Sequence, residues 1–173
     1  MEVSSADGHV LALFIEEPVP AGLSLAETLE RVGDQGGVCI AAHPMARWTP
    51  SLSADVIRAA LQAADLARVL VGIEVWNAGL VRRGGNLRAQ ALASEQAVAR
   101  VGNSDAHLAW SIGFAATRFR GHTAAHLRSA LELHTTEAVL RQRTLAAAYI
   151  ARWTLRKASM ALAGRSLPGS AAA

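Results

Sequence analysis

The chain has 173 residues, the length of one domain or of part of a larger protein, and 51% of them are apolar, which is enough for a sizeable core. A single cysteine, Cys39, excludes a disulfide framework and favours a reducing compartment, so we expect a cytoplasmic protein. The formal charge of +3 does not by itself indicate binding to nucleic acid. No stretch of this sequence has the charged-then-apolar pattern of a signal peptide, and no apolar run reaches membrane-spanning length.

The first fifteen residues predict two short strands joined by a turn. Residues 1–5 have the pattern of a strand end, Asp7 and Gly8 form a turn signal, and residues 9–15 are an apolar strand. This arrangement indicates a hairpin, or a strand that leaves a site and returns to it. Because a domain rarely opens on so short a strand, we expect the chain to be the later part of a longer one.

Strands and helices alternate in the next part of the chain. Ser24 and Glu27 form a capping box at the start of the first helix, and Ser53 caps the second. The continuous apolar runs are typical of strands buried on both faces of a parallel sheet. The pattern therefore predicts βα units around such a sheet. The predicted elements are helix 24–34, strand 38–42, helix 53–64, strand 69–73, helix 87–96 and strand 97–101.

Polar side chains follow three consecutive strands. His43 follows the first, Glu74 and Asn77 the second, and Asp105 and His107 the third. Active sites of α/β folds lie at the carboxyl edge of the sheet, and carboxylates and imidazoles bind Zn, Mn or Fe. The sequence therefore predicts a divalent-metal site at this edge. Considered alone, the Asp-x-His pair also fits a helix-capping aspartate and a surface histidine.

The last part of the chain predicts a strand at 113–119, a helix at 123–133 and one long helical pattern from 136 to 163. We assign residues 134–165 to a helical tail and residues 166–173 to a disordered end. The tail is either a helix that packs on the domain with solvated arginines, or a basic amphipathic helix that binds nucleic acid or a membrane surface.

Four short motifs in one order carry a resemblance to a known family. They are Glu2-Val3 with Asp7-Gly8-His9, Ala41-Ala42-His43-Pro44, Gly72-Ile73-Glu74-Val75-Trp76-Asn77, and Gly102-Asn103-Ser104-Asp105-Ala106-His107. Over residues 1–133 the chain resembles the later portion of the PHP family, the polymerase and histidinol phosphatase domains, including its small C-terminal region. The resemblance implies an α/β fold, here a partial, distorted, TIM-like barrel of the seven-stranded β/α type, followed by a C-terminal helix.

The resemblance also implies a metal centre. Glu2 would bridge two metal ions, and His9 and His43 would complete one site. Asp105 would join Glu2 in another site, His107 would serve a third, and Asp105 and His107 would be the catalytic residues. A complete family member holds up to three Mn, Zn or Fe ions.

Three further residues have expected roles near this centre. We expect Glu74 and Asn77 to support the ligands without contacting the metal. Arg47 is a candidate phosphate contact, because a guanidinium pairs bidentately with phosphate, although an ordinary surface salt bridge fits it equally well.

The resemblance implies a metal-dependent phosphoesterase, a hydrolase acting on a nucleotide, an oligonucleotide end or a small phosphomonoester. The N-terminal His-x-His pair of the family is absent, so only the site of Glu2, His9 and His43 keeps its three ligands. The alternatives are a non-catalytic module that binds metal, ligand or protein, and a protein that acts through its basic tail. An unclosed barrel would expose strand edges, so we expect self-association through them.

Overall fold

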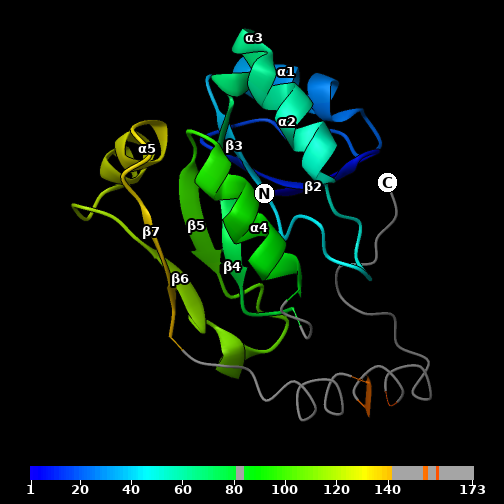
Figure 1. The fold of residues 1–173 in the computed structure, drawn as a ribbon, viewed down its shortest axis with the longest axis vertical. Helices are drawn as coiled ribbons and strands as arrows, with labels where there is room; N and C mark the ends of the chain where they lie inside the picture. The colour runs from blue at the N-terminus through cyan, green and yellow to red at the C-terminus, as the bar shows by residue number, and fades with distance from the viewer. Residues whose placement is uncertain (81–83, 142–153, 156–158, 160–173) are drawn as a thin grey trace.

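The computed structural model describes residues 1–80, 84–141, 154–155 and 159, which form an α/β fold with one five-stranded mixed sheet and one two-stranded sheet (Figure 1). The strands are β1 (Glu2–Ser5), β2 (Gly8–Leu13), β3 (Val38–Ala41), β4 (Leu70–Asn77), β5 (Ala99–Asn103), β6 (Ala115–Arg118) and β7 (Glu137–Leu140). The helices are α1 (Leu25–Gly33), α2 (Ala54–Gln62), α3 (Ala64–Ala67), α4 (Gly84–Glu95) and α5 (Ala124–Glu132), with a 3₁₀ turn at Ala109–Ser111.

The large sheet has the order β1-β2-β3-β4-β5 and changes direction within it. β1 and β2 form the predicted hairpin, in which Ser4 lies opposite His9, and β2 is antiparallel to β3. The strands β3, β4 and β5 are parallel, as the βα alternation predicts. The carboxyl ends of the three parallel strands therefore meet at one edge of the sheet, where the predicted site residues lie.

The predicted partial barrel is wrong. In the described part of the chain the large sheet is open, with β1 at one edge and β5 at the other. The two-stranded sheet of β6 and β7 lies beside β5, where Thr117 Oγ1 donates to Gly102 O at 2.9 Å and accepts from Gly102 N at 3.1 Å. Alternation of strands and helices does not separate a barrel from an open sheet, because closure depends on pairing between the first and last strands.

Apolar side chains cover both faces of the parallel strands. On one face, Leu29 of α1, Ile57 of α2 and Ala89 of α4 pack in one core cluster. On the other face, Leu131 of α5 packs against a second cluster that includes Val101. Figure 1 shows α4 in front of β4, and α5 beside β5 and apart from α1 and α2. All four residues of β3 are buried, which confirms the prediction of a strand buried on both faces.

Two further elements differ from the sequence predictions. β4 continues to Asn77, so Glu74 and Asn77 lie within the strand and not after it. Residues 137–140 form β7, where the start of a long helix was predicted, because they pair with β6 in an antiparallel register. Most of the predicted helical tail and all of the predicted disordered end at 166–173 lie outside the described residues. Among the helices that the structure describes, none has the length and hydropathy to cross a membrane.

Candidate metal centre

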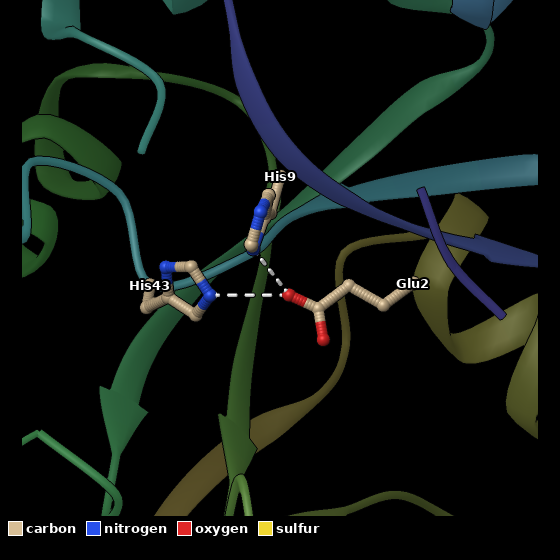
Figure 2. Close-up of side chains that lie close together, drawn as sticks. All are labelled: Glu2, His9 and His43. Atoms are coloured by element: carbon tan, nitrogen blue, oxygen red, sulfur yellow. Dashed lines mark hydrogen bonds and ion pairs between the residues drawn. The ribbon is translucent and has the colours of Figure 1, made fainter. Parts of the chain in front are cut away.

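Three predicted ligands converge beside the hairpin and the end of β3 (Figure 2). Oε1 of Glu2 lies 2.6 Å from Nδ1 of His9 and 3.3 Å from Nε2 of His43. One ligand atom from each residue lies within 4.8 Å of the other two. The group of Glu2, His9 and His43 could therefore hold a metal ion.

The hairpin register explains why Glu2 and His9 meet. Opposite residues of an antiparallel pair share a face, and Glu2 lies opposite Leu11 while His9 lies opposite Ser4, so Glu2 and His9 are diagonal neighbours on one face. His43 reaches the same point from the neighbouring strand, because Ala42 donates its backbone N–H to the carbonyl of His9 at 3.2 Å. The two strands of the hairpin and the residue two positions after β3 thus supply one ligand each.

The donor set fits a divalent transition metal. One carboxylate and two imidazoles match the ligands of Zn, Mn and Fe sites, and a three-ligand site leaves a position for water or substrate. His9 Nδ1 is buried, and despite its proximity to Glu2 it has no partner in hydrogen-bond geometry. The rings of His9 and His43 meet edge to face, with centroids 5.3 Å apart. Both present a nitrogen atom to Oε1 of Glu2.

A hydroxyl group orients His43. Ser51 Oγ donates to the carbonyl of Thr49 at 3.0 Å and lies 3.3 Å from Nδ1 of His43. Because the hydroxyl proton is directed at Thr49, the Ser51 oxygen is free to accept from Nδ1. When a metal replaces the proton on Nε2, this arrangement would keep the remaining proton on Nδ1 and leave the Nε2 lone pair for the metal. The sequence analysis did not identify Ser51.

The charges around the triad favour a cation. The hydrogen bond from His43 lowers the pKa of Glu2, against the opposing effect of partial burial. Burial acts to lower the pKa of His43, but the hydrogen bond to Glu2 and the negative charges of Glu74, Asp105 and Glu2 outweigh it, so the pKa is raised. The histidines thus lower the pKa of Glu2, and the carboxylates raise the pKa of His43.

A buried polar network joins His43 to Asp105. Glu74 is fully buried, and its Oε2 accepts from the backbone N–H of His43 at 2.6 Å and from Nδ2 of Asn77 at 2.9 Å. The same Asn77 nitrogen donates to Oδ2 of Asp105 at 3.1 Å. Burial raises the pKa of Glu74. Glu74 and Asn77, which were expected to support the site, thus each hydrogen-bond a predicted site residue, His43 and Asp105 respectively.

Asn86, which the sequence analysis missed, holds the backbone of Asn77. Its Oδ1 accepts from the Asn77 N–H at 3.1 Å, and its Nδ2 donates to the Asn77 carbonyl at 3.0 Å. The only signal in the sequence is an asparagine in the first turn of α4 that proves to be buried. A buried amide must be hydrogen-bonded, and the Asn86 side chain bonds both backbone groups of Asn77, as the backbone of a paired strand would.

The structure does not bring Asp105 and His107 into the triad. Among the described residues, the group that could hold a metal contains neither of them. They lie near one another, with Oδ1 of Asp105 3.7 Å from Nδ1 of His107, and the same nitrogen is 3.0 Å from the Asp105 carbonyl oxygen. Asp105 is linked to the triad through Asn77 and Glu74, and His107 is exposed. Arg47 is exposed on the loop after His43.

The comparisons with known proteins agree with the resemblance stated above. Residues 83–136 match a family model described as PHP-associated. This match confirms the predicted relation to the PHP family and places it in the segment that carries Asp105 and His107.

Two curated relatives come from Methanocaldococcus jannaschii. The chain is 36% identical to the uncharacterized protein MJ1587 over 77 residues, which is 44% of this chain and 40% of that protein. It is 30% identical to the uncharacterized protein MJ0417 over 119 residues, which is 68% of this chain and 49% of that protein. The chain thus spans less than half the length of these relatives.

The crystal structure of PsfC from Pseudomonas syringae PB-5123 has a similar fold. It superposes with a TM-score of 0.62 and 21% identity, covering 92% of this chain and 64% of PsfC. At this level of identity the similarity extends to the fold alone.

Proposed function

We propose that this chain supplies a divalent-metal centre, built from Glu2, His9 and His43, to a PHP-type hydrolase of phosphate esters. The observation that carries the proposal is the convergence of one carboxylate and two imidazole nitrogens within 4.8 Å. The relation to the PHP family supports the reaction class. Because the chain spans less than half of its curated relatives, the activity of the whole protein is part of this proposal.

The residues around the triad have complementary roles in this reaction. A bound divalent ion supplies Lewis-acid activation of water and neutralises phosphate charge. Asp105, held at Oδ2 by Asn77, accepts a proton from the attacking water at Oδ1, and the exposed His107 protonates the leaving oxygen. Arg47 contacts the phosphate oxygens of the incoming ester.

Metal content provides the first test. Purified chain incubated with Mn²⁺, Zn²⁺ or Fe²⁺ and then desalted is expected to retain about one ion per chain, as one three-ligand site requires. Glu2→Gln and His43→Ala should each weaken binding at least ~10-fold, because each removes a ligand from the site. His122→Ala, which removes an exposed histidine outside the triad, should not. A folded chain without metal, or metal that survives in His43→Ala, contradicts the proposal.

Turnover separates this function from a non-catalytic metal-binding module. The module is favoured by one observation, that Asp105 and His107 lie outside the triad. Release of phosphate from p-nitrophenyl phosphate or a nucleotide, dependent on metal and lost in both His43→Ala and Asp105→Ala, supports the hydrolase. Stoichiometric metal with no release of phosphate supports the module.

A further inference from the structure

Glu74 is a carboxylate in an unusual place. It lies in the middle of β4, between β3 and β5, and none of its surface is exposed to solvent. Glutamate is almost never fully buried unless it is paired, because a carboxylate loses its hydration on burial. The partners of Glu74 therefore indicate what the burial achieves.

One partner follows the neighbouring strand β3, the other is the last residue of β4 itself, and both bonds end on the same atom. Oε2 accepts the backbone N–H of His43, which follows β3, and the amide of Asn77, which in turn donates to Asp105 after β5. The other oxygen, Oε1, is buried and has no hydrogen-bond partner among the described residues. Among the described residues, both hydrogen bonds of the carboxylate are therefore accepted by Oε2.

The two residues that depend on this acceptor have strained backbones. His43 has φ of 29° and Asp105 has φ of 45°, both in the left-handed region that residues with a Cβ rarely adopt. Such conformations persist where surrounding contacts hold them. For His43, the bond from its own N–H to Glu74 is a contact of this kind.

We infer that Glu74 is a positioning residue, whose Oε2 fixes the backbone of the metal ligand His43 and, through Asn77, the orientation of the Asp105 carboxylate. One buried acceptor at the centre of the sheet thereby sets the relation between the loop after β3 and the loop after β5. The inference rests on the proposed function for its link to metal, but the hydrogen bonds can be tested without any metal.

Two substitutions separate the acceptor from the volume that Glu74 fills. Glu74→Gln can place its amide oxygen at the position of Oε2 and keep both bonds, with the NH₂ group at the position of Oε1. Glu74→Leu fills a similar volume and offers no acceptor. A role in packing alone would make leucine the milder change, whereas a positioning role makes glutamine the variant that restores function.

Amide hydrogen exchange of the metal-free protein, followed by NMR, tests the bond to His43. In Glu74→Leu the His43 amide should exchange at least ~10-fold faster than in the wild type, because it has lost its acceptor. The Ala42 amide, bonded to the His9 carbonyl, should keep its rate and serves as a reference in the same spectrum. Glu74→Gln should keep both rates. An unchanged His43 rate in Glu74→Leu, or equal acceleration in both variants, overturns the inference.

Asn77→Ala tests the second half of the network and provides a route if Glu74→Leu does not fold. It removes the link between Glu74 and Asp105 and leaves the bond from His43 to Glu74 in place. The His43 exchange rate should be unchanged while the backbone resonance of Asp105 shifts. An accelerated His43 amide, or an unshifted Asp105 resonance, contradicts the inference.

Metal affinity links the positioning role to function. Titration with Co²⁺, read from its visible absorption, should show binding to Glu74→Leu weakened 10- to 100-fold, the range typical of groups that orient a ligand, and binding to Glu74→Gln within ~3-fold of wild type. Wild-type affinity in Glu74→Leu overturns the link. If the wild type binds no Co²⁺, the proposed metal centre fails, and the exchange rates still decide the role of Glu74.

Discussion

Gly8, the first residue of β2, connects the hairpin to the loop that orients His43. Its φ is +140°, and a Cβ added there would lie 2.4 Å from the backbone nitrogen of Leu52 and 2.5 Å from the carbonyl carbon of Ser51. Both contacts are with backbone, so neither can be relieved by a side-chain rotation. Since Ser51 Oγ faces Nδ1 of His43, a shift of this segment moves a group that orients a ligand.

We therefore expect Gly8→Ala to be strongly destabilising. The left-handed backbone costs a residue with a Cβ about 1–2 kcal/mol, and forcing an extra carbon into a packed region costs about 1–3 kcal/mol. Together they predict a loss of about 2–5 kcal/mol in the free energy of unfolding, measured by urea denaturation. The metal affinity of whatever protein remains folded should fall as well, because the Ser51 segment has moved.

Gly22→Ala is the matched control. Gly22 also has positive φ, +84°, but nothing lies within 4 Å of an added Cβ. Its substitution should cost only the backbone term, about 1–2 kcal/mol, and leave metal affinity unchanged. If Gly8→Ala is no more destabilising than Gly22→Ala, the close contact with the 51–52 segment does not constrain the site, and the reasoning is refuted.

Three further outcomes are expected. Cys39 is buried and its pKa is raised to about 12 by that burial, so a thiol reagent at pH 8 should label it only at the rate of unfolding, and fast labelling of native protein would contradict this. In metal-free protein the Glu2–His43 pair should stabilise the fold most between pH 4.5 and 6.5, the ordinary pKa values of the two groups. The lowered pKa of Glu2 stabilises the folded state above pH 4.5, and the raised pKa of His43 stabilises it below pH 6.5. Urea midpoints should show this maximum in wild type and not in Glu2→Gln. β1 is an edge strand, so we expect concentration-dependent self-association by sedimentation velocity, reduced in Ser4→Pro, whose N–H faces away from β2.

Local signals in the sequence predict most of the helices and the parallel strands. The capping box at Ser24 forms as expected, with the Ser24 N–H 2.9 Å from Oε2 of Glu27 and the Glu27 N–H 3.2 Å from Oγ of Ser24. The strand at 137–140 was mistaken for helix because the residues after it are rich in alanine and leucine. Its pairing with β6 is a contact between distant segments, and such contacts override local preference.

In the candidate site, too, some features follow from local sequence signals and others depend on contacts that the sequence pattern does not show. Order along the chain places His43 and Asp105 at strand ends, and the βα pattern then puts them at one edge of the sheet. The roles of Ser51 and Asn86 depend on contacts with residues 8 and 9 positions away, which no periodicity reveals. For Glu74 the sequence did contain a signal. A glutamate within an apolar strand is expected to be buried, and a buried carboxylate needs hydrogen-bond donors or a charge partner.

The three ligands of the proposed centre differ in how firmly the fold holds them. His43 is 5% exposed and is fixed by Glu74 on its backbone and by Ser51 on its ring. His9 lies on β2, which is paired on both sides. Glu2 is 42% exposed and lies on the edge strand β1. Metal affinity requires the three ligand atoms to be in place together. Because Glu2 is the least fixed of the three ligands, ordering it contributes most of the remaining entropic cost of binding. A contact that pairs with β1 would therefore strengthen metal binding more than any change at His43.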